Sequence, residues 1–208
     1  MDKKKILLFG GTFNPIHNGH LIVARHIAEM LKFNKVAMIP NGDPPHKKGV
    51  VDRMHRYKML KQALLVGGND DTLFDLCRHE MDKFEPSYTI DTVRYFKRML
   101  GDAIDKPYWL IGPDNLYDID NWHDPDALAE ECSFVVGIST MTDPRCYTKT
   151  EDTDRIMSKY DIQTVIIPHI DIRSTEIRNR IARGLPVRHY VPDAVEEYIR
   201  ENGLYKTQ

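Results

Sequence analysis

The fold is decided by the stretch Lys5-Ile6-Leu7-Leu8-Phe9-Gly10-Gly11-Thr12-Phe13-Asn14-Pro15-Ile16-His17-Asn18-Gly19-His20. Its continuous apolar run, residues 6–9, is typical of a parallel strand covered on both faces, and the double glycine lets the backbone turn sharply and approach a ligand closely. Apolar residues then recur every three or four positions from Leu21 to Leu31, which predicts a helix capped by Asn18. Together these features predict a nucleotide-binding strand, turn and helix start.

The two histidines of this stretch, His17 and His20, are predicted to lie on one face of that helix, at its N-terminal end. A helix N-terminus attracts phosphate through its free N–H groups and its dipole. We expect Gly19 to leave the space between the two rings clear for a ligand. A single histidine in this position could equally well satisfy only backbone groups, but the paired spacing favours a phosphate site.

Further apolar runs and amphipathic stretches alternate along the rest of the chain. The additional strands are expected at residues 35–40, 72–77, 108–112, 133–138 and 163–168, and the additional helices at 53–66, 87–100, from 174 and from 193. Strands that alternate with helices imply a parallel sheet. We therefore predict an α/β fold with a doubly wound, Rossmann-like parallel sheet of five to six strands and helices on both faces.

The chain length of 208 residues suits one α/β domain with a substantial core. We predict a single domain over residues 1–208, with a C-terminal helical portion over 174–208. Residues 140–161 are polar and irregular, with a short helix expected around 153–160. We interpret them as an inserted surface excursion that adds little to the core.

Three polar features follow predicted strands, where loops of such folds carry function. Lys47 and its neighbours place three cations in the loop 41–49, which suits phosphate, although an ordinary solvated loop has the same composition. Asp114 follows Gly112, where a carboxylate meets a nucleotide ribose in doubly wound folds, or else it caps the next helix. Trp122 lies in an acidic stretch without an apolar period, which favours stacking over a place in the core.

Two further helix starts carry hydroxyl groups. Ser87 and Thr89 are candidate caps of the helix that begins there, and Thr89 could also offer donors to a ligand. Ser174 or Thr175 is expected to cap a later helix, and Arg178 lies within reach of the same N-terminus. We interpret this second start as an anion site, although a plain cap with a solvated arginine is the commoner state of this pattern.

Charge and cysteine content exclude several classes of protein. The net charge of −2 and the pI near 6.5 offer no basic surface for stable nucleic-acid binding. Cys77, Cys132 and Cys146 form no close pair, which argues against a disulfide framework and a zinc site and favours a reducing cytoplasm. The N-terminal residues are too short and too charged for a signal peptide or a membrane span, so we expect no membrane association.

The motifs together resemble the nicotinate-nucleotide adenylyltransferase family of the bacterial type, within the nucleotidylyltransferase superfamily. The resemblance rests on His17-Asn18-Gly19-His20, Pro44-Pro45-His46-Lys47, Ser87-Tyr88-Thr89-Ile90-Asp91-Thr92, Gly112-Pro113-Asp114 with Trp122, Ser174-Thr175-Glu176-Ile177-Arg178, and Val191-Pro192 through Gly203-Leu204-Tyr205. It covers nearly the whole chain. Arg173, Pro113 and the length of the stretch 140–161 depart from the family pattern and leave the fine shape of the ATP pocket open.

The resemblance implies roles for individual residues. Catalysis would fall to His17, His20, Lys47 and Arg178. ATP would be bound by Gly10, Gly11, Thr12, Phe13, His17, His20, Gly112, Asp114, Ile172, Ser174, Thr175 and Arg178, with Asp114 at the adenosine ribose. The pyridine nucleotide would be bound by Asn14, Lys47, Thr89 and Trp122.

The implied reaction joins ATP to nicotinate mononucleotide and needs no nucleophilic side chain, because a nucleotide 5′-phosphate is itself largely ionised at neutral pH. No carboxylate cluster suggests a protein-built metal cage, so Mg²⁺ is expected to arrive on ATP. Two other functions stay open: another adenylyl- or cytidylyltransferase, such as one acting on phosphopantetheine, and a non-catalytic nucleotide sensor. The choice between nicotinate and nicotinamide mononucleotide and the presence of a homo-oligomer also stay open.

Overall fold

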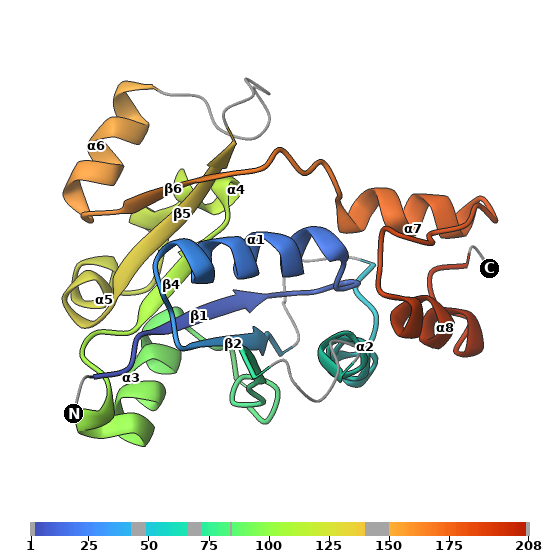
Figure 1. Cartoon of the computed structure of the whole chain (residues 1–208), viewed down its shortest axis with the longest axis horizontal. Coiled ribbons are helices and arrows are strands. Elements are labelled where there is room, and N and C mark those ends of the chain that lie inside the picture. The colour runs from blue at the N-terminus through green and yellow to red at the C-terminus, as the bar shows by residue number, and fades with distance from the viewer. Residues whose placement is uncertain (1–2, 43–48, 66–71, 84, 140–149, 207–208) are drawn as a thin grey trace. The chain divides into compact units, whose positions relative to one another are not determined.

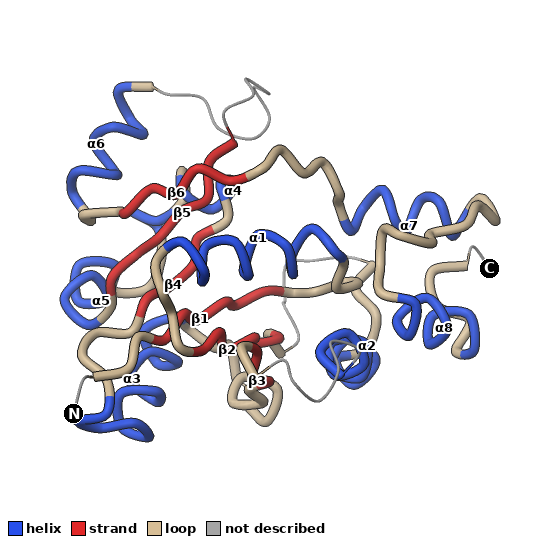
Figure 2. Tube along the Cα trace, viewed as in Figure 1, coloured by secondary structure: helices blue, strands red, loops and turns tan. Residues whose placement is uncertain are grey.

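The computed structural model describes residues 3–42, 49–65, 72–83, 85–139 and 150–206, without the side chain of Asp114. Its strands form a six-stranded sheet in the order β3-β2-β1-β4-β5-β6 (Figures 1 and 2). They are β1 (Ile6–Gly11), β2 (Lys35–Pro40), β3 (Phe74–Leu76), β4 (Tyr108–Ile111), β5 (Ser133–Ser139) and β6 (Gln163–Ile167). The pairs β1–β4, β4–β5 and β5–β6 are parallel. The predicted Rossmann-like α/β sheet is confirmed.

Helices follow most of the strands in the chain. They are α1 (Asn18–Met30), α2 (Arg53–Leu65), α3 (Thr89–Leu100), α4 (Pro113–Leu116), α5 (Pro125–Glu131), α6 (Glu151–Lys159), α7 (Ser174–Ala182) and α8 (Asp193–Glu201), with 3₁₀ turns η1 (Gly101–Ala103) and η2 (Ile119–Asn121). The strand order reverses between β1 and β4. Doubly wound sheets bind their ligands beyond the strand ends at such a reversal.

The chain forms two compact units. The first comprises Met1–Gly10, Val23–Ala37 and Ser87–His169, and the second comprises Gly11–Ile22, Met38–Pro86 and Ile170–Gln208. Each unit has its own buried apolar residues, so each is described by itself. The prediction of one domain over residues 1–208 stays a prediction.

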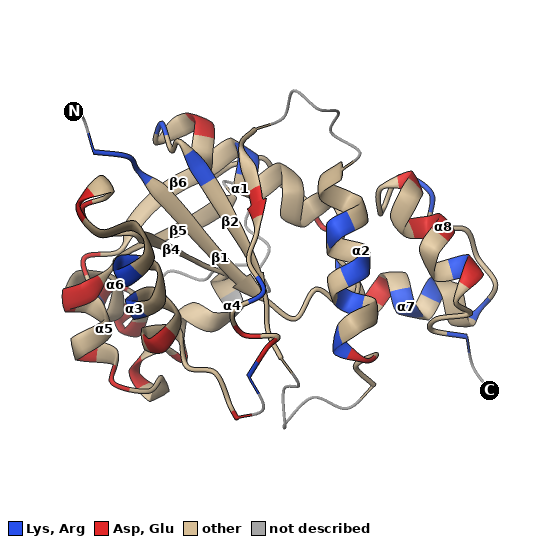
Figure 3. Cartoon of the chain, turned by 90° about the horizontal axis from the view of Figure 1, so that it is seen from below, with Lys and Arg blue, Asp and Glu red and all other residues tan. Residues whose placement is uncertain are grey.

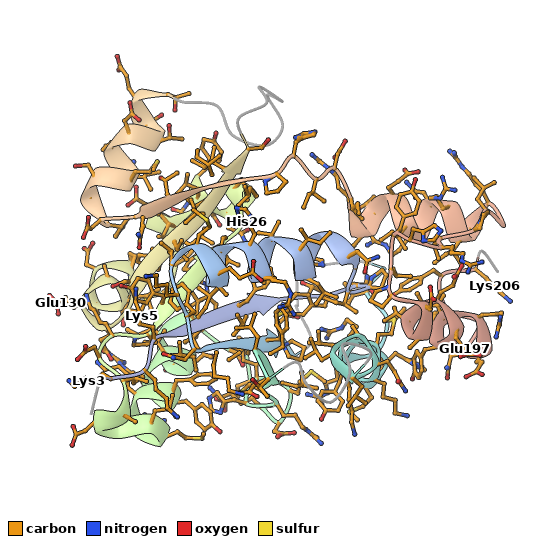
Figure 4. The ribbon with its side chains drawn as sticks, in the orientation of Figure 1. Lys3, Lys5, His26, Glu130, Glu197 and Lys206 are labelled. Carbon is orange, nitrogen blue, oxygen red and sulfur yellow. The ribbon has the colours of Figure 1, made fainter. Side chains whose placement is uncertain are left out.

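The first unit has its core around the strands β4 and β5. Its fully buried residues include Leu7, Leu8, Ile27, Val93, Ile119, Leu128, Phe134, Val135 and Val136. Helices α3 and α5 pack against each other, and Glu131 at the end of α5 accepts bonds from Arg94 (2.7 Å) and Lys97 (3.3 Å) of α3. On α1, His26 Nε2 lies 3.1 Å from the carbonyl oxygen of Ile166 in β6 (Figure 4).

The second unit has its core around α2, α7 and α8. Its buried residues include Ile16, Met38, Ile39, Met59, Leu60, Ile177, Val191, Val195 and Ile199. Helices α2 and α8 pack together, and His55 Nδ1 lies 2.9 Å from the hydroxyl of Tyr198. Val195 and Ile199 are buried, and Tyr198 is half-buried.

The double glycine does not form the predicted turn, because Gly10 and Gly11 are the last two residues of strand β1. A Cβ on Gly10 would lie 2.6 Å from Cζ2 of Trp109, so the missing side chain makes room for that buried indole. The chain turns instead at Phe13, whose φ of 46° lies in the left-handed region. The expectation that both glycines form the turn is therefore wrong, and their small size serves packing.

The predicted helix caps are also wrong in three places. Helix α1 begins at Asn18 itself, α3 is preceded by Tyr88, and α7 by Arg173, with no side-chain cap bond recorded at Tyr88 or Arg173. At α1 and α7 the polar side chains bond to distant backbone groups instead: Asn18 Nδ2 donates to the oxygen of His189 (2.8 Å) and Ser174 Oγ to that of Pro15 (2.9 Å). Tertiary partners thus replaced the local bonds that the sequence pattern suggested.

The stretch 140–161 is described only from residue 150. Thr150 and Thr153 form a capping box at the start of α6, and Ile156 and Tyr160 are only 3% and 4% exposed. Since α6 connects two neighbouring parallel strands, it occupies the place of a crossover helix. The expected short helix is confirmed, whereas the expectation that this stretch adds little to the core is wrong for its described part.

Two other predictions concern cysteines and membranes. Cys77 and Cys132 are free, and Cys146 lies outside the described residues. Among the residues that the structure describes, no helix has the length and apolar character needed to cross a bilayer.

Candidate functional site

His17 and His20 cap the start of α1 with reciprocal hydrogen bonds. The backbone N–H of His20 donates to Nδ1 of His17, and the backbone N–H of His17 donates to Nδ1 of His20, each over 3.3 Å. Because α1 begins at Asn18, His17 is the cap residue and His20 the third residue of the helix. This reciprocal pattern is that of a capping box, in which both partners are normally shorter side chains. The rings stack with centroids 3.6 Å apart and planes at 22°.

The reciprocal bonds also determine where each imidazole carries its proton. A backbone N–H can only donate, so both Nδ1 atoms accept, and the proton of each neutral ring must sit on Nε2. Burial lowers the pKa of His17 to about 4. Burial, and secondarily the proximity of His17, lowers the pKa of His20 well below its usual value. At neutral pH the pair therefore consists of two uncharged Nε2–H donors at a helix N-terminus.

The missing side chain of Gly19 makes room for the ring of His17 and does not leave an open space. A Cβ on Gly19 would lie 3.1 Å from Nδ1 of His17 and 3.3 Å from Cγ2 of Ile170. The ring of His17 thus occupies the space that was expected to remain clear for a ligand, and this expectation is wrong. The prediction that the two rings share one helix face is confirmed by their stacking.

Phe13 and Thr12 lie in the turn that leads to these histidines. Phe13 is 2% exposed and meets His20 edge to face, with ring centroids 5.2 Å apart. The hydroxyl of Thr12 accepts a bond from Asn41 Nδ2 over 3.2 Å. The described turn is therefore packed against the histidine pair on one side and bonded to the end of β2 on the other.

The start of α7 is bonded to the same turn. Ser174 Oγ donates to the oxygen of Pro15 (2.9 Å), and Arg178 Nη1 donates to the oxygen of Asn14 (2.8 Å). Arg178 Nη2 also donates to the hydroxyl of Thr175 over 3.3 Å. The acceptors of the first two bonds, Pro15 and Asn14, precede His17 by two and three residues. The structure thus brings together the two helix starts that were predicted separately, with Ile172 half-buried just before α7.

The side chain of Asn14 is engaged within the protein. It is 5% exposed; its Oδ1 accepts from the hydroxyl of Tyr205 (2.8 Å) and the N–H of Val51 (3.3 Å), and its Nδ2 donates to the oxygen of Gly49 (3.1 Å). Burial raises the pKa of Tyr205, which keeps the phenol a donor. The contact of Asn14 with a pyridine nucleotide stays a prediction. The sequence analysis assigned no role to Tyr205 and missed this bond.

Arg56 is a second residue that the sequence analysis missed. It is fully buried in α2, a helix whose charged residues are Lys and Arg, without Asp or Glu (Figure 3). Its guanidinium donates to the carbonyl oxygens of Thr12 (3.0 Å), Asn41 (2.8 Å), Gly42 and Val51 (3.2 Å). It therefore ties the residues that follow β1 to those that follow β2. The sequence did contain a signal for this burial: Arg56 precedes Met59 and Leu60 by three and four residues, which places it on the apolar face of the helix.

The first unit holds four more of the predicted residues, Thr89, Gly112, Asp114 and Trp122. Gly112 precedes α4, Pro113 is its first residue, a position that suits proline, and the side chain of Asp114 is not described. Thr89 is the first residue of α3, and Trp122 follows η2 and is half-buried, unlike the buried Trp109. Lys47 lies outside the described residues.

An aromatic stack joins the segments that carry Thr89 and Trp122. The rings of Tyr88 and His123 lie parallel, with centroids 4.2 Å apart and planes at 23°. Each ring belongs to the direct neighbour of a predicted pyridine-nucleotide residue. The structure therefore brings these two segments of the first unit side by side.

Metal-type ligands are not grouped in the described part of the chain. There, no three side chains of His, Cys, Asp or Glu approach closely enough to hold an ion together. A hydrated magnesium ion needs no such set, since it commonly keeps several waters and binds substrate phosphates. The Nε2–H groups of His17 and His20 and the guanidinium of Arg178 are donors of the kind that suits phosphate oxygens.

Comparisons with known proteins match the chain along nearly its whole length. Residues 8–180 match the family model described as Cytidylyltransferase-like. The probable nicotinate-nucleotide adenylyltransferase of Caldicellulosiruptor bescii is 39% identical, covering 97% of this chain and 99% of its own. The corresponding protein of Thermoanaerobacter sp. is 36% identical, covering 96% and 93%.

Solved structures agree on the fold. Plasmodium falciparum nicotinic acid mononucleotide adenylyltransferase complexed with NaAD superposes with a TM-score of 0.76 and 20% identity, covering 97% of both chains. The same protein complexed with APC gives a TM-score of 0.74 at 19% identity. At such identity the likeness concerns the fold alone.

Proposed function

Since the chain belongs to the nicotinate-nucleotide adenylyltransferase family of Cytidylyltransferase-like proteins, we propose that it transfers the adenylyl group of ATP to the 5′-phosphate of nicotinate mononucleotide. The products are nicotinate adenine dinucleotide and pyrophosphate, in NAD biosynthesis. Within the structure, the main support for this proposal is the histidine pair at the start of α1, in which both rings are neutral and carry their proton on Nε2. Ser174 and Arg178 bond the start of α7 to the turn that precedes this pair.

The reaction forms one P–O bond and breaks another. An oxygen of the mononucleotide phosphate attacks the α-phosphorus of ATP, the bond from that phosphorus to the bridging oxygen breaks, and pyrophosphate leaves with the electron pair. The attacking phosphate is already largely ionised at neutral pH, so no side chain has to remove a proton. The protein must align two polyanions and stabilise the charge on the phosphorus oxygens and the leaving group.

The residues of the second unit supply these functions in the proposal. His17 and His20 donate from Nε2 to phosphate oxygens of ATP, and the N–H groups at the two helix starts add their dipoles. Arg178 uses two of its donors for Asn14 and Thr175, and a guanidinium has five. Its remaining donors and its charge serve the leaving pyrophosphate, together with Lys47 and the backbone N–H of Ser174, whose hydroxyl proton is already donated to Pro15. Gly11, Thr12, Phe13 and Ile172 shape this pocket.

The residues of the first unit serve the nucleosides. Gly112 and Asp114 meet the adenosine ribose, and Gly10 lets the backbone of β1 approach ATP closely. Thr89 and Trp122 bind the pyridine ring and its ribose phosphate. Asn14 acts mainly by holding its turn, given its engaged side chain. The stack of Tyr88 on His123 supports a shared site for Thr89 and Trp122.

Mg²⁺ enters the proposal as the ion that ATP carries, where it neutralises phosphate charge. The two histidines, the backbone N–H of Ser174 and Arg178 would bind phosphate oxygens as well. We further propose a cytoplasmic location, on the basis of the unpaired cysteines. The absence of stable nucleic-acid binding stays a prediction, and the presence of a homo-oligomer stays open.

A pyrophosphate-release assay tests the function directly. The protein is given ATP with nicotinate mononucleotide, nicotinamide mononucleotide or 4′-phosphopantetheine in separate reactions. We expect turnover with the pyridine nucleotides and none with phosphopantetheine. Turnover only with phosphopantetheine would identify another adenylyltransferase, and binding of ATP without any turnover would identify a nucleotide sensor.

A further inference from the structure

Asp120 is the centre of a network on the surface of the first unit. Its carboxylate accepts bonds from the hydroxyl of Tyr160 (2.6 Å), from Arg155 Nη2 (2.8 Å) and from Lys159 Nζ (3.1 Å). All three donors belong to α6 or to the residue that ends it. Four groups from two segments, 35 to 40 residues apart in the sequence, thus meet at one carboxylate.

Asp120 is the middle residue of the 3₁₀ turn η2, and Trp122 follows that turn directly. The N–H of Trp122 donates to the oxygen of Ile119 over 3.1 Å, which closes the turn. Ile119 is fully buried, so one side of the turn faces the core and the other side carries Asp120. A displacement of Asp120 must therefore move the backbone of Trp122.

The network keeps the Asp120 carboxylate charged. The hydrogen bonds from Tyr160, then Arg155 and Lys159, hold the pKa of that carboxyl well below its usual range. Lys159 in turn contacts Asp126 on α5 at 3.2 Å, a contact that does not involve the turn. Exposed ion pairs stabilise proteins little by themselves. A cluster with three donors on one acceptor is better suited to setting geometry than to adding stability.

The other side of the same turn is held by the stack of His123 on Tyr88. Tyr88 immediately precedes Thr89 at the start of α3. Trp122 therefore stands between two supports, α6 through Asp120 and α3 through His123. This arrangement would serve a half-buried indole that has to present its face to a flat ligand.

We propose that Asp120 is a positioning residue of the pyridine-nucleotide subsite, which acts by holding the turn that carries Trp122 against α6. The inference rests on the proposed function, because it takes Trp122 as the residue that stacks on the pyridine ring. Asp120 itself needs no contact with either substrate. Its removal loosens the turn and leaves the residues of the second unit that are proposed to bind the ATP phosphates unchanged.

The test compares steady-state constants of Asp120→Ala, Trp122→Ala and the double variant. For Asp120→Ala we expect the KM for nicotinate mononucleotide to rise roughly 2- to 20-fold, less than for Trp122→Ala, with the KM for ATP unchanged. Because Asp120 acts through Trp122, its removal should add nothing in the Trp122→Ala background. Asp126→Ala, which removes the other carboxylate at Lys159, is the matched control and should behave as the parent.

Tyr160→Phe provides a second variant that removes one bond and keeps the packed ring. It should raise the same KM in the same direction, by a smaller factor. Equal rises in the KM values of both substrates, or effects of Asp120→Ala and Trp122→Ala that multiply in the double variant, would overturn the inference. A parent without turnover on nicotinate mononucleotide would refute the proposed function, and a normal KM in Trp122→Ala would refute the role of Trp122.

Discussion

At the start of α1 the two histidines are held by bonds that span three residues, whereas the turn that carries Trp122 is held by bonds that span 35 to 40. His17 is 5% exposed and its partners are backbone groups of the same helix start. The Trp122 turn is held at the surface by charged side chains and an aromatic stack. The first region is rigid by local geometry, and the second depends on other elements being in place.

This difference matches the task proposed for each region. Transfer of an adenylyl group depends on donors held in position before the charge develops, and a helix start with two buried rings provides that. Recognition of a flat ring by stacking tolerates small adjustments and depends on an exposed face. The two regions should therefore respond differently to substitution, the first in rate and the second in affinity.

The largest effect is expected at the histidine pair. His17→Ala or His20→Ala should lower kcat by roughly 10²–10³, the scale for loss of one preorganised donor. His17→Asn is the sharper variant, because asparagine is a good helix cap but lacks the donor at the position of Nε2. We expect the same loss of rate as for alanine with a melting temperature closer to that of the parent.

His26→Asn is the control for these variants, because it changes a histidine of the same helix that bonds to Ile166. It should leave kcat at the parent value. A parental rate in either His17 variant would contradict the assignment of His17 as a phosphate donor.

Because burial lowers the pKa of both histidines, the free energy of unfolding should depend on pH. Burial lowers the pKa of His17 to about 4, below the 6.5 of an ordinary histidine, so the unfolded chain binds the proton first as the pH falls. The contribution of His17 to stability is complete above pH 6.5 and is lost as the pH falls toward 4. The loss is on the order of 3 kcal/mol. Denaturant unfolding at several pH values should show a shallower dependence in His17→Asn, and equal slopes would contradict the assignment.

A smaller effect is expected at Trp122. Its replacement by alanine should weaken binding of nicotinate mononucleotide by about 5–150-fold, the value of ~1–3 kcal/mol for a stacked base, with ATP affinity unchanged. Trp109→Ala is the matched contrast, because Trp109 is buried and should cost about 3–5 kcal/mol of stability instead. Separate titrations of the two ligands and a melting curve distinguish these outcomes. Equal losses for both ligands with a large drop in melting temperature would make Trp122 structural.

The smallest effect is expected at Gly19. A Cβ there would press on the ring of His17 at 3.1 Å, so Gly19→Ala should displace that ring by a few tenths of an ångström. We expect kcat to fall roughly tenfold or less, while the better helix propensity of alanine, up to about 1 kcal/mol, offsets the strain. An unchanged rate would show that the ring position tolerates this shift.

The stretch of residues 5–20 allowed much of this protein to be predicted. The apolar run, the spacing of the histidines and the alternation of strands and helices indicated a parallel sheet with a phosphate site at its first helix, because these patterns follow from local periodicity. The stacking of His17 on His20 follows from a spacing of three residues on a helix. The resemblance of the motifs to one family predicted the reaction and the roles of individual residues.

The roles of side chains that bond across the chain were decided by the tertiary structure alone. Asn18 and Ser174 looked like caps but donate to distant carbonyl groups, and Gly10 makes room for Trp109 rather than for a turn. The guanidinium of Arg56, the phenol of Tyr205 and the carboxylate of Asp120 find partners up to 191 residues away. Such partners leave no periodic trace in the sequence, because a hydrogen bond depends on distance in space and not on separation along the chain.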